Sequence, residues 1–123
     1  MKGQALVLFA HGARDPRWSE PFERLCMMVQ AKRPSLHVGL AFLDFLQPDL
    51  KTAVQAAVQQ GANRIRIVPL FFGRGGHLRD DFPKQLEAVR SALPHARIEV
   101  TQAAGEADPV LEALAEFALA GIA

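Results

Sequence analysis

Residues 5–12 have the sequence ALVLFAHG, an unbroken apolar run that ends at His11 and Gly12. A short run without polar alternation is typical of a strand buried on both faces, as in parallel sheets. The next apolar side chains recur at helical spacing, at Phe22, Leu25, Cys26 and Val29. The chain therefore begins with a buried strand followed by an amphipathic helix.

The same pattern of strand and helix recurs three more times along the chain. Further strands are predicted over residues 36–45, 64–71 and 96–101. The helices after them are marked by the apolar sets Leu50, Ala53, Val54, Ala57 and Val58, then Leu86, Val89 and Leu93, then Leu111, Leu114, Ala115 and Ala118. Asp108 and Pro109 supply the N-cap and first turn of the last helix. This alternation predicts a single doubly wound α/β domain over residues 1–123, with a four-stranded parallel sheet in the order 2-1-3-4 and helices on both faces.

The composition excludes several classes of protein. Half of the residues are hydrophobic, and 14 Lys and Arg balance 13 Asp and Glu, so neither disorder nor nucleic-acid binding is expected. The apolar runs are too short to cross a membrane. Cys26 is the only cysteine and belongs to an apolar stripe, so it is expected in the core of a protein from a reducing compartment. The start of the chain shows no secretory signal, and the prediction is a cytoplasmic protein.

Three polar side chains follow the predicted strands at their carboxyl ends. They are His11, Asp44 and His77. In open parallel sheets, ligands bind at that edge where the strand order reverses. Two imidazoles and a carboxylate there would suit a divalent transition metal. Gly12, Gly75 and Gly76 would let a flat ligand approach the backbone closely.

Other interpretations of these residues stay open at this point. A histidine after a strand is often only a turn residue, and Asp44 could instead cap the second helix. Residues 73–77 could form a backbone nest for an anion such as phosphate. His37 and His95 fall at the opposite edge or in a turn and are expected to be structural.

Three stretches of the chain resemble the class II chelatases, above all the short sirohydrochlorin cobaltochelatases of the CbiX type, which are related to sirohydrochlorin ferrochelatase. These stretches are residues 7–16, VLFAHGARDP, residues 41–44, AFLD, and residues 68–83, VPLFFGRGGHLRDDFP. The family has Glu where this chain has Asp44, and more often Ser where it has Ala13. The resemblance implies a chelatase-like fold in which His11 and His77 are the catalytic and metal-binding histidines, with Asp44 as a third metal ligand.

The resemblance also implies a lyase that inserts a divalent metal ion into sirohydrochlorin during cobalamin or sirohaem biosynthesis. The metal is a substrate, Co²⁺ first with Fe²⁺ or Ni²⁺ as alternatives, and no organic cofactor is implied. Arg14, Arg74 and Arg79 could hold the carboxylates of the tetrapyrrole. Short members of the family act as homodimers. A metal-binding or tetrapyrrole-binding module without catalysis is the alternative, and a metal-independent anion-binding domain is the third hypothesis.

Overall fold

Four parallel strands form one sheet in the order β2-β1-β3-β4, as the sequence predicts. The computed structural model describes residues 3–73 and 76–123, and for residues 76–79 it describes the backbone alone. The strands are β1 (Gln4–Ala10), β2 (His37–Phe42), β3 (Arg64–Pro69) and β4 (Arg97–Val100). The helices are α1 (Glu20–Lys32), α2 (Leu50–Gln59), α3 (Gly76–Ala92) and α4 (Asp108–Leu119), with 3₁₀ turns η1 (Pro16–Ser19) and η2 (Ala104–Glu106).

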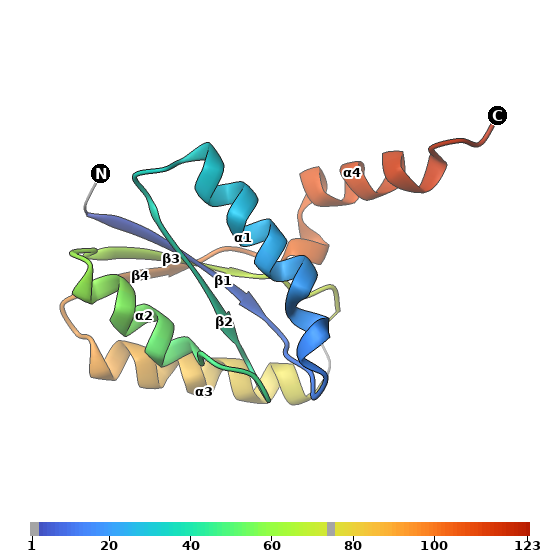
Figure 1. The fold of residues 1–123 in the computed structure, drawn as a ribbon. Coiled ribbons are helices and arrows are strands. Elements are labelled where there is room, and N and C mark those ends of the chain that lie inside the picture. The colour runs from blue at the N-terminus through green and yellow to red at the C-terminus, as the bar shows by residue number, and fades with distance from the viewer. Residues whose placement is uncertain (1–2, 74–75) are drawn as a thin grey trace.

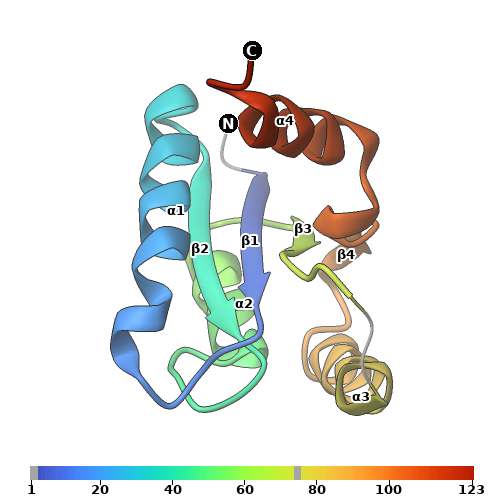
Figure 2. The same cartoon turned by 90° about the vertical axis from the view of Figure 1, so that its right-hand side faces the viewer.

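The helices lie on both faces of the sheet. Figures 1 and 2 show α1 on one face and α2 and α3 on the other, whereas α4 leaves the body of the molecule. The core lies between the sheet and the pair α2 and α3, and its largest fully buried side chains are Val7, Phe9, Leu50, Val54, Ile65, Ile67 and Val89. No helix in the described part of the chain is both long and apolar enough to cross a membrane.

The apolar residues that recur at helical spacing in α2 form its buried face. Leu50, Ala53, Val54 and Ala57 are all buried, which puts them on one face of α2. The side chain of Asp49 accepts a hydrogen bond from the N–H of Thr52 at 2.9 Å and caps the helix. The interpretation of Asp44 as this cap was therefore wrong. Gly61, with φ of 99°, takes the left-handed conformation that follows the helix.

Several element bounds differ from the sequence prediction. β2 ends at Phe42 and β3 at Pro69, although apolar residues continue beyond both. The predicted strands are too long because Leu43 and Phe71 are apolar and buried, as strand residues would be, but do not belong to a strand. Asp108 lies inside the first turn of α4, and the N-cap is Ala107.

Cys26 is only half-buried, so its placement in the core was wrong. Its thiol contacts the carbonyl of Val38 on β2, 3.9 Å away. In the described part of the chain α1 packs mainly against β2 and η1, and none of its residues is fully buried.

Candidate active site

The carboxyl ends of β1, β2 and β3 meet at one edge of the sheet. Ala10 pairs with Phe42 on one side, and Phe9 pairs with Pro69 on the other. The pairing continues past the strands, because the N–H of Leu43 donates to the carbonyl of Ala10 at 2.9 Å. The next N–H, that of Asp44, donates to the carbonyl of His11 at 3.1 Å. Two of the three predicted site residues are therefore neighbours.

Gly12 allows these two loops to pack backbone against backbone. Its φ is 95°, and a Cβ added to it would lie 1.8 Å from the carbonyl oxygen of Asp44. No other residue fits this position, because any side chain would overlap the neighbouring main chain. The group that approaches Gly12 in this structure is the Asp44 backbone, and the approach of a flat ligand stays a prediction.

His11 is exposed to solvent at this edge. The residue is exposed, and its ring lies 6.0 Å from that of buried Phe71, nearly perpendicular at 80°. An edge contact of this kind orients the imidazole without covering it. A neutral imidazole nitrogen at an open sheet edge can bind a metal ion or accept a proton.

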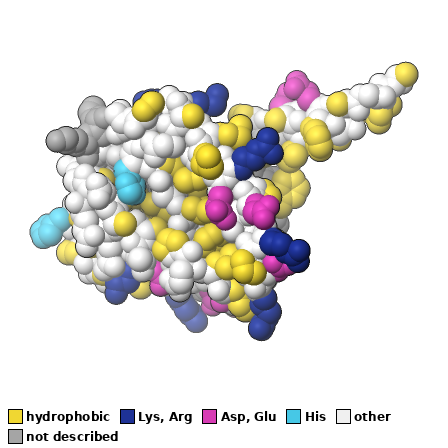
Figure 3. Space-filling model, in the orientation of Figure 1, with side chains coloured by type: hydrophobic (Ala, Val, Ile, Leu, Met, Phe, Trp, Pro, Cys, Tyr) yellow, Lys and Arg dark blue, Asp and Glu magenta, His cyan; other side chains and the backbone are white. Residues whose placement is uncertain are grey.

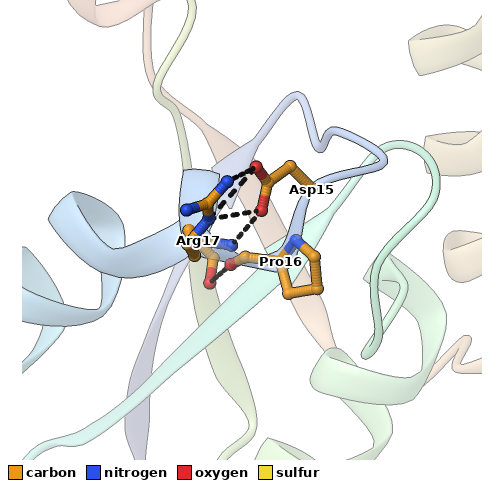
Figure 4. A network of polar contacts seen from close by, with 4 residues as sticks. Asp15, Pro16 and Arg17 are labelled. Carbon is orange, nitrogen blue, oxygen red and sulfur yellow. Dashed lines mark hydrogen bonds and ion pairs between the residues drawn. The ribbon is translucent and has the colours of Figure 1, made fainter.

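The loop after His11 is shaped by a local charge pair. The carboxylate of Asp15 accepts hydrogen bonds from the N–H and the guanidinium of Arg17, the shortest at 2.8 Å (Figure 4). These bonds cap η1, lower the pKa of the Asp15 carboxyl below its ordinary value and raise the pKa of Arg17. The charge of Arg17 is thereby balanced within the loop.

Arg14 extends instead toward the loop that follows β2. Its guanidinium carbon lies 4.8 Å from the ring centroid of Phe45, a cation–π contact. Phe45 directly follows Asp44 and has a φ of 65°. Phe45 falls within the predicted second strand, residues 36–45, and no pattern in the sequence indicates a role for it. Its position one residue after a predicted ligand was the only available signal.

The third strand end is described in part. Gly76 begins α3, so His77 falls in the first turn of that helix. Gln85, further along α3, donates to the carbonyl of Leu43 at 3.1 Å and ties the helix to the same edge. Arg74 and Gly75 lie outside the described residues, as do the side chains of His77 and Arg79. Among the side chains that are described, no group of three His, Cys, Asp or Glu could hold a metal ion. The joint site of His11, Asp44 and His77 stays a prediction.

The comparison with known proteins gives relatives of two activities. The chain is 36% identical over 88 residues to the sirohydrochlorin cobaltochelatase of Methanocaldococcus jannaschii, covering 70% of this chain and 60% of that protein. It is 27% identical over 111 residues to the sirohydrochlorin ferrochelatase of Bacillus subtilis, covering 90% of this chain but only 42% of that protein. The chain thus spans about half the length of these two relatives.

A solved structure of similar length also matches nearly the whole chain. A CbiX protein of cobalamin (vitamin B12) biosynthesis from Marinobacter aquaeolei superposes with a TM-score of 0.78 at 29% identity, covering 94% of this chain and 93% of that one. The family model described as CbiX matches residues 5–119, which is nearly the whole chain. The chain therefore belongs to the CbiX family.

Proposed function

We propose that this chain is a sirohydrochlorin chelatase, a lyase-type enzyme that inserts a divalent metal ion into the tetrapyrrole. The observation that carries the proposal is exposed His11 at the carboxyl edge of the sheet, where its backbone carbonyl accepts the N–H of Asp44. Membership of the CbiX family supports it. Co²⁺ is the first choice of metal substrate and Fe²⁺ an alternative, because relatives of both cobalt and iron activity match. Ni²⁺ is a further alternative that the family resemblance alone suggests.

The reaction needs groups that the edge of the sheet offers. The ion must exchange its bound water for nitrogen ligands, and two pyrrole N–H protons must leave the macrocycle. His11 can hold the ion or take a proton, since an imidazole nitrogen is both a metal ligand and a base. We assign the second such role to His77, and we assign Asp44 as a third ligand of the metal ion. Arg14, Arg74 and Arg79 would bind the carboxylates of the substrate and orient its ring. No organic cofactor is needed for this exchange.

Anaerobic incubation with sirohydrochlorin and Co²⁺, followed by visible absorption, tests the proposal. We expect the protein to accelerate metallation and His11→Ala to lower the rate at least about 100-fold, the range for loss of an acid–base group. His77→Ala should have a similar effect. The matched control is His37→Ala, because His37 begins β2 at the opposite edge of the sheet. Full activity in both His11→Ala and His77→Ala would refute the proposal.

A binding module without catalysis is the second candidate. The observation that favours it is Asp44, whose side chain is one methylene shorter than the Glu of the family pattern. Such a module would bind the tetrapyrrole or the ion without turnover. If the protein does not accelerate metallation but Asp44→Glu does, the shorter carboxylate is the cause.

We also propose that two copies of the chain, each a single domain, associate through α4 and act in the cytoplasm, where a lone cysteine stays reduced. Apolar side chains of α4 are strongly exposed, with Phe117 at 79% and Leu119 at 64%. They stand on a helix that projects from the body and packs mainly against η2 (Figure 3). The Bacillus subtilis relative, of which the chain covers 42%, has room for a second unit of this size, which supports a second copy as the partner.

Light scattering after size-exclusion chromatography tests the association. We expect a mass of twice the 13.5 kDa of one chain, and a return to 13.5 kDa when Leu114 and Phe117 are both changed to Glu. The control is Met27→Glu, since Met27 is 73% exposed on α1. A wild-type mass of 13.5 kDa at micromolar concentration would contradict the dimer.

A further inference from the structure

Phe45 combines two properties that folding alone does not favour. Its side chain is 56% exposed, although a phenyl ring gains from burial. Its φ of 65° lies in the left-handed region, where a bulky residue is an outlier. Conformations of this kind gather at ligand sites, where the surrounding structure enforces them.

The surrounding loop holds Phe45 in place through Asp44. The carboxylate of Asp44 accepts a hydrogen bond from the N–H of Phe45 at 3.2 Å, and its carbonyl accepts one from the N–H of Leu46 at 2.8 Å. The N–H of Asp44 donates to His11 in turn. The position of the phenyl ring is therefore linked by main-chain bonds to the strand end that carries His11.

Arg14 adds a charge to this ring. Its guanidinium stacks on Phe45 across the gap between the loop after β1 and the loop after β2. Both side chains are exposed, so the pair presents an aromatic ring with a cation over one of its faces. A conjugated macrocycle that bears carboxylates has the complementary chemistry, since its flat face can pack on a ring and its carboxylates can pair with a guanidinium.

We propose that Phe45 is a substrate-contact residue, whose ring packs against the tetrapyrrole while Arg14 on the same ring pairs with one of its carboxylates. The inference rests on the proposed function and adds Phe45 to the substrate site. In this arrangement the ring sets the position of the macrocycle relative to His11. The unfavourable backbone conformation of Phe45 persists because it keeps the ring exposed at this edge.

The variant Phe45→Asn separates binding from folding. Asn is among the few residues that adopt a positive φ readily, so the loop keeps its conformation while the ring is lost. We expect the Kd for metal-free sirohydrochlorin, measured by the anisotropy of its own fluorescence, to rise about tenfold. The KM should rise with it while kcat changes little, because the ring contributes binding rather than proton transfer. The melting temperature should stay at or above that of the wild type.

Two further measurements complete the test. Arg14→Gln should weaken binding and reduce its dependence on salt, and the double variant should lose less than the sum of the two single losses, because the two side chains act as one surface. The control is Met28→Ala, since Met28 is 53% exposed, similar to Phe45, but lies two turns along α1. An unchanged Kd in Phe45→Asn, with a wild type that binds normally, would overturn this inference alone. A wild type that binds no tetrapyrrole would overturn the proposed function as well.

Discussion

Replacing Gly12 by Ala is the most severe single change that the site geometry predicts. The new Cβ would lie 1.8 Å from the carbonyl oxygen of Asp44, so the two loops must separate by at least about 1.2 Å to reach the 3.0 Å limit of real contacts. The left-handed backbone, with φ of 95°, adds about 1–2 kcal/mol for any residue with a Cβ. Separation of the loops also weakens the hydrogen bond from Asp44 to His11, at about 1 kcal/mol. The expected loss of unfolding free energy is about 2–3 kcal/mol.

Urea denaturation measures this loss. With a slope of about 1–3 kcal/mol/M, the midpoint should fall by about 0.7–3 M while the slope itself stays constant. The matched control is Gly73→Ala, because a Cβ at Gly73 would meet nothing within 4 Å and its φ is not positive. It should stay within about 0.5 kcal/mol of the wild type. If Gly12→Ala were as mild as this control, the loops could not be packed as described.

Three further predictions concern the body of the fold. Phe9→Ala should cost about 3–5 kcal/mol in urea denaturation, because Phe9 is fully buried between Phe71 and Phe82, and a loss below about 1 kcal/mol would contradict this packing. The bond from Thr52 lowers the pKa of Asp49 below its ordinary 3.8, so the capping stability is present above that pH and is lost as the pH falls through the lowered pKa. Asp49→Asn should keep the cap and remove this part of the acid dependence, which unfolding measurements between pH 2 and 5 would detect. Burial raises the pKa of the Cys26 thiol, so iodoacetamide should react with Cys26 more slowly than it reacts with the free thiol of glutathione at the same pH. A faster reaction of Cys26 would refute its burial.

The topology could be predicted because apolar runs report burial on both faces. The run at residues 5–10 implied a central strand, and β1 does pair on both sides. The same signal failed at strand ends. Leu43 and Phe71 are apolar and buried like their neighbours in the strands, yet both lie beyond the strand ends. Apolar character records where a side chain lies, and it says nothing of where its backbone hydrogen bonds go.

The site was predictable only where it depends on the sheet. His11 and Asp44 follow adjacent strands, so their proximity comes from topology. The contact between Arg14 and Phe45 comes instead from a loop that turns through a positive φ at a phenylalanine, and no local preference predicts that conformation. The position of α4 could not be predicted for a similar reason, because periodicity identifies an apolar face without showing what covers it.

The order of the strands also affects how the chain is made. β1 is synthesised first but lies between β2 and β3, so both of its partners are made after it. At about 5–20 residues per second, the ribosome needs about 3–12 s to go from the end of β1 to the end of β3. During these seconds one edge of an apolar strand has no partner, whereas elementary pairing takes only microseconds once the partner is present. The early stage of synthesis, more than the finished fold, is therefore when this chain is most exposed to aggregation, and when binding of residues 5–10 by a chaperone would protect it most.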